Sequence, residues 1–155
     1  MDILEWIHEN RQEKFIQKDM DYASQEGFLE IVEWFHKNSE AGCTKNAMDY
    51  ASKNGHLEIV KFLHFNRTEG CTENAMNYAS GNGHFEIVEF LHYNRTEGCT
   101  VLAMDWATIE GFFDIFKFLY KNRPEGYEDA VGYAIYHGHP KIYEFIKEQK
   151  IRENF

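Results

Sequence analysis

The pattern of hydrophobic and polar positions repeats along this chain every 28 residues. Segments 44–71 and 72–99 differ at only six positions, and Met and Gly recur with the same spacing. These recurrent residues are Met20, Met48, Met76 and Met104, and Gly27, Gly55, Gly83 and Gly111. A fixed period of this length is typical of repeat proteins. We interpret residues 1–155 as a single domain, with a half-repeat over 1–15 and repeats starting near residues 16, 44, 72, 100 and 127.

Each repeat contains the patterns of two short helices. In the copy that begins at Thr44, a favourable N-cap, residues 47–51 place Ala and Met at the spacing of one helical stripe. Gly55 then ends the first helix, because glycine tolerates the left-handed conformation. Residues 59–63 give the second helix an apolar face, and Asn66 is expected to end it in the same left-handed way. Helices of roughly nine residues are unstable alone, so the pattern predicts that they stack on neighbouring copies.

Residues 54–60, Asn-Gly-His-Leu-Glu-Ile-Val, resemble the centre of the ankyrin repeat, and the string recurs at 82–88 and more loosely at 26–32. Two features depart from that family. Its Thr-Pro-Leu-His opening is replaced by Asn-Ala-Met-Asp at 46–49, and the period is 28 residues instead of about 33. The missing residues fall within 67–72, where ankyrins project a β-hairpin finger. The resemblance implies an all-α, ankyrin-like solenoid of stacked helix pairs with reduced or absent fingers.

The same resemblance implies a non-catalytic scaffold or adaptor that binds another protein through its concave face and needs no cofactor. Sixteen Lys and Arg against 26 Asp and Glu give a formal net charge of −10, which disfavours nucleic acid and anionic lipid as partners. The chain lacks an apolar run long enough for a spanning helix. Its acidic first residues do not resemble a signal peptide, so we expect a cytoplasmic protein that is not secreted.

Positions that differ between copies are free to carry recognition. The copy that begins at Thr100 has apolar residues where other copies have polar ones, and the next copy adds an aromatic residue nearby. We predict that these residues form a partner-binding patch: Val101, Leu102, Ile109, Phe112 and Tyr136. Carboxylates rim this patch and favour a partner with a basic rim; they are Asp105, Glu110 and Asp129. The alternative is that these apolar side chains tuck between repeats. A second candidate on the outer helices is Phe65 with Tyr93.

Histidines and acidic residues also form columns along the repeats. The histidine column is His8, His36, His64 and His92. We expect each ring to fill the layer between repeats and to donate to a neighbouring carbonyl, the alternatives being a pH switch or a metal site. The acidic column on the first helix is Asp21, Asp49 and Asp105, with Asn77 in one copy. We expect it to make hydrogen bonds between repeats rather than to perform acid–base catalysis. His56, His84 and His139 are interpreted as turn residues.

Cysteines and aromatic residues at fixed repeat positions are expected to pack inside the array. Cys43, Cys71 and Cys99 lie one repeat apart, too far for disulfides or a zinc knuckle, and fit buried free thiols. Two aromatic columns are predicted to be core: the first is Tyr22, Tyr50, Tyr78, Trp106 and Tyr133, and the second is Trp6, Trp34, Phe62, Phe90, Phe118 and Phe145.

One further alternative to a monomeric binder is self-association by end stacking. The last helix carries Ile146, Ile151 and Phe155, and their side chains would give the end of the array an apolar surface. Such a surface can bind a second copy in the way that one repeat binds the next.

Overall fold

The computed structural model describes residues 15–123 and 129–153, and these contain ten α-helices and no strand. The helices alternate between a first and a second helix of each repeat. The first helices are α2 (Gln17–Gln25), α4 (Lys45–Lys53), α6 (Glu73–Gly81), α8 (Val101–Ile109) and α10 (Ala130–Tyr136). The second helices are α3 (Leu29–Asn38), α5 (Leu57–Asn66), α7 (Phe85–Asn94), α9 (Phe113–Asn122) and α11 (Pro140–Glu153). The predicted all-α solenoid is therefore confirmed, whereas most of the expected half-repeat 1–15 lies outside the described residues.

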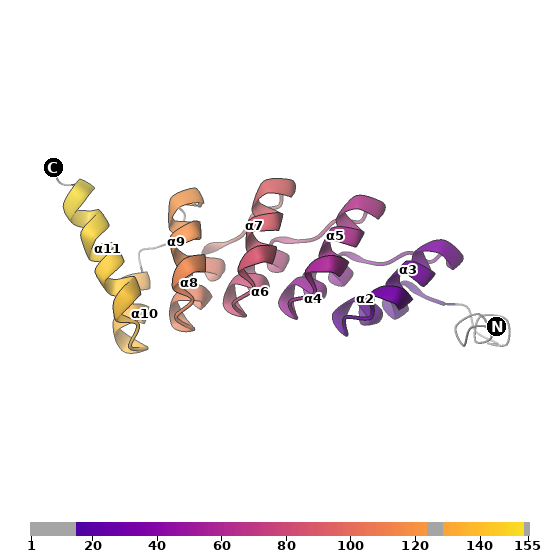
Figure 1. Ribbon diagram of the computed structural model, residues 1–155, viewed down its shortest axis with the longest axis horizontal. Helices are drawn as coiled ribbons and strands as arrows, with labels where there is room; N and C mark the ends of the chain where they lie inside the picture. The colour runs from indigo at the N-terminus through magenta and orange to yellow at the C-terminus, as the bar shows by residue number, and fades with distance from the viewer. Residues whose placement is uncertain (1–14, 124–128, 154–155) are drawn as a thin grey trace.

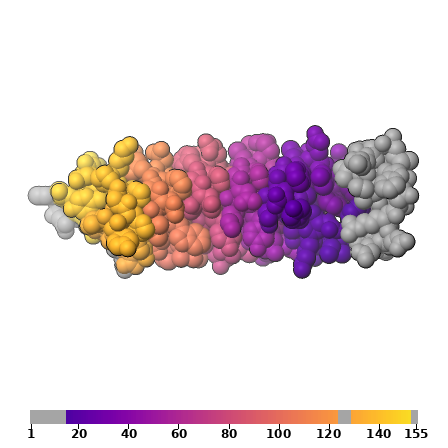
Figure 2. Space-filling model, turned by 90° about the horizontal axis from the view of Figure 1, so that it is seen from below, coloured from indigo at the N-terminus to yellow at the C-terminus, as the bar shows by residue number. Residues whose placement is uncertain are grey.

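The helix pairs stack side by side in one row, with α2 and α11 at opposite ends (Figure 1). From a second direction the repeats form successive bands of an elongated molecule (Figure 2). First helices of successive repeats pack more closely on each other than second helices do. Buried alanines allow this approach because their side chains are short, as Ala47 and Ala51 do in α4. The first helices consequently form the narrower side of each wedge-shaped repeat.

The helix ends follow the expected threonine caps but not the expected asparagine geometry. The Thr44 hydroxyl accepts a hydrogen bond from the backbone N–H of Asn46, and Thr72 and Thr100 repeat this contact. Asn66, in contrast, stays helical and donates from its side chain to the Phe62 carbonyl at 2.9 Å. Positive φ angles occur only at glycines in the described ranges. Expecting Asn66 to adopt a left-handed backbone was therefore wrong, because its side chain caps the last turn instead.

The acidic column links successive repeats at Asp21, Asp49 and Asn77, as predicted, whereas the Oδ1 atom of Asp105 has no hydrogen-bond partner. Asp49 accepts hydrogen bonds from the Thr72 backbone N–H at 2.8 Å and from the Thr72 hydroxyl at 2.7 Å. Asp21 makes the same two bonds with Thr44. In the third copy Asn77 accepts from the Thr100 N–H and donates its own amide N–H to the Thr100 hydroxyl. The threonine therefore caps its own helix and also ties that helix to the preceding one.

Histidines that follow the glycine stops form a second link between repeats that the sequence analysis did not recognise. His84 is the N-cap residue of α7, and its Nε2 lies 3.1 Å from the carbonyl oxygen of Lys53 in the preceding repeat. Its ring covers Gly55, whose φ of +83° and close approach leave no room for a side chain. His56 and His139 occupy equivalent positions on Gly27 and Gly111. These histidines are consequently inter-repeat contacts and more than turn residues.

A tight ion-paired turn lies where ankyrins carry a finger. Arg67 pairs with Glu69, and Glu69 also accepts a hydrogen bond from the backbone N–H of Cys43 in the preceding repeat. Burial alone raises the pKa of Glu69, but the bonds from Arg67 and from backbone N–H groups outweigh it and lower the pKa to about 2. Arg95 and Glu97 form the same pair one repeat later. The turn thus stays compact and contributes ion pairs instead of a projecting hairpin.

Cys43 and Cys71 are free thiols in the described structure. Cys43 and Cys71 are buried, as expected, whereas Cys99 is half-buried. Burial, followed by the nearby Glu69 carboxylate, raises the pKa of Cys43 to about 12. This thiol stays protonated near neutral pH and behaves as a small apolar group of the core.

Candidate functional site

The predicted residues of α8 lie on the first-helix side of the array. The side chains of Val101 and Leu102 are 45% and 39% exposed, and Ile109 is half-buried. Leu102, Trp106 and Ile109 follow one another at i, i+4 and i+7, so they share one face of α8. Tyr136, at the end of α10, is 86% exposed. An apolar stripe therefore lies open on α8 and is followed by an exposed aromatic residue on the neighbouring helix.

The first aromatic column is not core, which corrects the prediction. Tyr22 is 61% exposed, and the other four members are half-buried: Tyr50, Tyr78, Trp106 and Tyr133. Recurrence at one repeat position indicates a common environment, but it does not say whether that environment is buried. Here the close packing of the first helices leaves room between them only for alanine and similar small side chains, so the rings lie on the surface of these helices.

Trp106 is the best-supported ring of this column. It lies parallel to the Tyr78 ring, with 6.0 Å between ring centroids. A glycine at position 81 makes room for it, because a Cβ atom there would lie only 3.0 Å from the Trp106 Cβ and 3.1 Å from Cε3. We define the first-helix patch as seven apolar and aromatic residues of α6, α8 and α10. Its members are Tyr78, Val101, Leu102, Trp106, Ile109, Tyr133 and Tyr136.

Phe112 lies apart from the first-helix patch. It precedes α9 in the position that His56 and His84 take in other repeats, and its ring covers Gly83. The half-buried ring packs against the hydrophobic core. The structure therefore brings Val101, Leu102, Ile109 and Tyr136 to adjacent first helices and places Phe112 at the turn between α8 and α9.

The charged residues on α6, α8 and α10 are of one sign. Helices α6, α8 and α10 contain neither lysine nor arginine, whereas α2 and α4 carry Lys18, Lys45 and Lys53. Among the described residues, four carboxylates lie on or beside α6, α8 and α10: Glu73, Asp105, Glu110 and Asp129. Burial and the nearby Asp129 raise the pKa of Asp105. This part of the surface is thus acidic and apolar together.

The second aromatic column packs as predicted over the described residues. Trp34, Phe62, Phe90, Phe118 and Phe145 are half-buried against the core, while Trp6 lies outside the described residues. His64 packs edge-on against Phe90 of the next repeat, and His36 and His92 make the same contact with their own neighbours. The histidine column therefore fills the layer between second helices; His8 lies outside the described residues.

The hydrogen bonding of the histidine column differs from the prediction. His92 does not donate to a carbonyl: its Nδ1 accepts a hydrogen bond from Nε of Arg123 at 3.2 Å. His64 Nδ1 is buried without a hydrogen-bond partner. Burial, followed by the charge of Arg95, lowers the pKa of His64, and Arg123 acts in the same way on His92. Burial and the arginines of the following turns therefore favour the neutral form of these rings.

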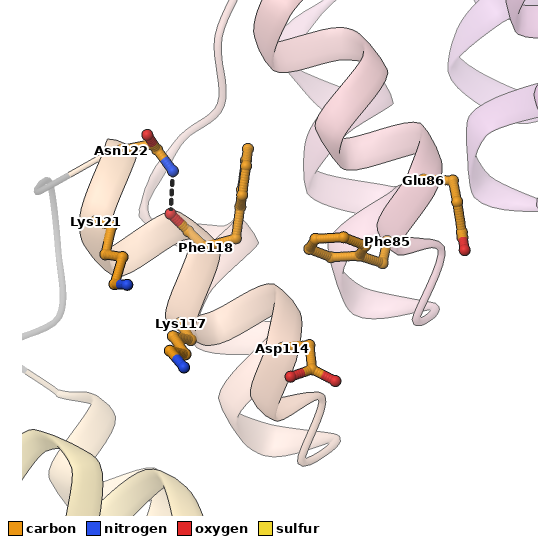
Figure 3. Close-up of a pocket in the computed structure, with 7 residues that line it drawn as sticks. All are labelled: Phe85, Glu86, Asp114, Lys117, Phe118, Lys121 and Asn122. Atoms are coloured by element: carbon orange, nitrogen blue, oxygen red, sulfur yellow. Dashed lines mark hydrogen bonds between the residues drawn. The ribbon is translucent and has the colours of Figure 1, made fainter.

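Phe65 and Tyr93, the second predicted site, lie on the second helices with 70% and 68% of their surfaces exposed. Each packs edge-on against an aromatic ring of the next repeat, Phe90 for Phe65 and Phe118 for Tyr93. Near them an outer groove of about 520 Å³ lies between α7 and α9 (Figure 3). Its lining is Phe85, Glu86, Asp114, Lys117, Phe118, Lys121 and Asn122. Mixed charges give this groove no clear preference for one sign of ligand.

The C-terminal end of the array is only partly apolar. Ile146 is 1% exposed and belongs to the core, so expecting it on a stacking surface was wrong. Ile142 and Ile146 lie one turn apart on α11 and together form its buried face. Ile151 is exposed, and Phe155 lies outside the described residues. A shallow hollow of about 330 Å³ remains beside Ile151; its lining includes Val131 and Tyr143.

The described ranges show neither a metal cluster nor a spanning helix. Across 15–123 and 129–153, no group of three or more His, Cys, Asp or Glu side chains is placed to hold a metal ion. Within the same ranges, no helix combines the length and apolar character that crossing a bilayer requires. Surface features of the described residues include the first-helix patch, the outer groove, the terminal hollow and a smaller hollow of about 300 Å³ that Phe90 and Tyr93 help to line.

Comparison with known families agrees with this architecture. The family model for ankyrin repeats, in three copies, matches residues 20–105 and 48–129, and together these matches cover more than two thirds of the chain. The chain belongs to the ankyrin repeat family. Ankyrin repeats generally mediate protein–protein interaction. A search of curated proteins finds no match.

Proposed function

We propose that this ankyrin repeat protein is a non-catalytic adaptor that binds a protein partner through the concave, first-helix side of the array. The observation that carries the proposal is the first-helix patch, where Val101, Leu102 and Tyr136 are exposed on the same side as the aromatic column of the first helices. Contiguous exposed apolar surface with a polar rim is characteristic of interaction sites. The stacked repeats hold these side chains in place before binding, so little conformational entropy is lost on association.

Two features support the charge that we propose for the partner and the location that we propose for the protein. The carboxylates around the first-helix patch favour a partner with a basic rim, because opposite charges guide docking and reject like-charged surfaces. The free thiols of Cys43 and Cys71 fit a reducing compartment, which supports a cytoplasmic location.

The test is a double substitution, Leu102→Ala with Ile109→Ala. We expect it to weaken capture of partner proteins from the native cell while the melting temperature changes little, because Leu102 is exposed and Ile109 half-buried. The matched control is Phe65→Ala with Tyr93→Ala on the second helices. A large loss of stability with unchanged capture would show that the α8 residues are core. Loss of capture in the control alone would move the binding site to the second helices.

Self-association is the second candidate, and the hollow beside Ile151 at the end of the array is the observation that favours it. Sedimentation velocity over a range of protein concentrations distinguishes the two proposals. A concentration-dependent dimer that Ile151→Lys abolishes would support end stacking. A monomer at all concentrations would exclude it.

A further inference from the structure

The acidic column is interrupted at Asp105, inside the first-helix patch. Asp21 and Asp49 each accept two hydrogen bonds from a threonine of the next repeat, and Asn77 pairs with the equivalent threonine, Thr100. The copy after Asp105 has no threonine at the corresponding place. The Oδ1 atom of Asp105 is buried and has no hydrogen-bond partner. A carboxylate oxygen in this situation retains the cost of its lost hydration.

A second carboxylate increases the negative charge at the same place. Asp129 precedes α10 and is exposed, and it lies close enough to Asp105 to raise the pKa of that carboxyl group. Like charges repel unless a cation separates them. Helices α8 and α10 supply neither lysine nor arginine to balance this pair, so a basic side chain of a partner would complement it.

The aromatic column points to the same ligand chemistry. The ammonium group of Lys53 lies 5.5 Å from the Tyr78 ring centroid, a cation–π contact between one first helix and the next. At the position of Lys53 the following repeats carry Gly81 and Ile109. Trp106 and Tyr133 therefore lack the cation that this position provides to Tyr78, although Trp is the ring that binds cations best.

We propose that the partner segment bound by the first-helix patch is cationic and apolar, with arginine or lysine side chains between aliphatic ones. A basic side chain lies at the Asp105–Asp129 pair, and aliphatic side chains cover Val101, Leu102 and Ile109. A second basic side chain lies against the exposed part of the half-buried Trp106 ring. This inference rests on the proposed function and adds the chemistry of the partner to it.

Selection from a display library of random peptides against the intact protein tests this inference. We expect the selected peptides to be richer in arginine or lysine and in aliphatic residues than the input library. Their affinity should fall about tenfold in the variant Asp105→Asn with Asp129→Asn, as expected for the loss of a close charge pair. Since Asp129 is exposed, the single substitution Asp129→Asn keeps the fold and should give part of this loss.

Matched charge changes elsewhere separate a specific site from general attraction to an acidic protein. Glu86→Gln with Glu89→Gln removes the same two charges from the exposed surface of α7, and we expect less than about a twofold effect. An equal loss in this control overturns the inference. Selected peptides that are neutral or acidic, yet lose binding in the Leu102→Ala, Ile109→Ala variant, also overturn it while the proposed function stands. If the selected peptides bind equally well to the Leu102→Ala, Ile109→Ala variant, or if no peptide is selected, both this inference and the proposed function are contradicted.

Discussion

Asp49 offers a direct test of how adjacent repeats are held together. This buried carboxylate accepts two hydrogen bonds from Thr72, at 2.7 and 2.8 Å, and thereby joins α4 to the N-terminus of α6. We predict that Asp49→Ala lowers the free energy of unfolding by about 3 kcal/mol. Hydrogen bonds to a charged group contribute about 1.5–3 kcal/mol each, and the lower end applies because the substitution also relieves the cost of burying a charge.

The chain itself provides the control for this prediction. Asn77 occupies the same position one repeat later and pairs with Thr100 through both its carbonyl oxygen and its amide N–H. Asp49→Asn should therefore keep both contacts, with the threonine hydroxyl changing from donor to acceptor, and cost about 1 kcal/mol or less. Urea denaturation followed by far-UV circular dichroism measures both variants. The reasoning is refuted if asparagine costs as much as alanine.

The pH dependence of stability gives an independent check on the same residue. Burial raises the pKa of Asp49 above its usual 3.8, although the hydrogen bonds from Thr72 oppose the shift. The folded state consequently binds a proton more tightly than the unfolded chain does. The contribution of Asp49 to stability is thus greatest below its ordinary pKa and falls as pH rises through the raised value. Asp49→Asn should remove this fall, whereas an unchanged pH profile would show that the carboxyl group is not responsible.

Three further predictions concern glycine and histidine positions. Gly55→Ala should lower unfolding free energy by at least about 1 kcal/mol in urea denaturation, because φ is +83° and a Cβ atom would lie 2.7 Å from the His84 ring. Gly132→Ala is the opposite case: this helical position has no neighbour within 4 Å of an added Cβ, so stability should rise by about 1 kcal/mol. Burial and Arg95 lower the pKa of His64 below 6.5, so stability should fall as pH drops below that value, and His64→Gln should reduce the fall. An unchanged unfolding free energy in Gly55→Ala would contradict the first argument, and a lower one in Gly132→Ala would contradict the second. An unaltered loss of stability at acid pH in His64→Gln would contradict the third.

Several assignments depended on contacts between copies, which a repeat pattern does not describe. The threonine caps could be predicted because Thr44 acts within its own helix. His84 was assigned to a turn, since its acceptor is the carbonyl of Lys53, 31 residues earlier in the chain. Asn66 was assigned the wrong geometry, because a side-chain cap and a left-handed backbone both favour asparagine at a helix end. In each case the residue type indicated a structural role, but the sequence did not show which group the side chain contacts.

The candidate site shows the same division. Exposed Val101 and Leu102 were recognised from their difference from other copies, whereas Trp106 and Tyr78 were assigned to the core. Gly81 could have indicated the position of Trp106. It occupies the repeat position that Lys53 has in the preceding copy, and it lies beside the one tryptophan of the first aromatic column. Its meaning became clear only when the ring was seen to lie against it.

The sequence by itself determined the repeat, the two helices in each copy and their stop signals, because these depend on residues close together in the chain. It also determined that the copies stack, since such short helices cannot persist alone. Tertiary structure decided which side of each helix faces solvent. Buried alanines bring the first helices close together, and this spacing moves one aromatic column to the surface while the other stays packed against the core. Which side chains are buried depends on the distance between neighbouring copies. That distance cannot be inferred from the sequence of one copy.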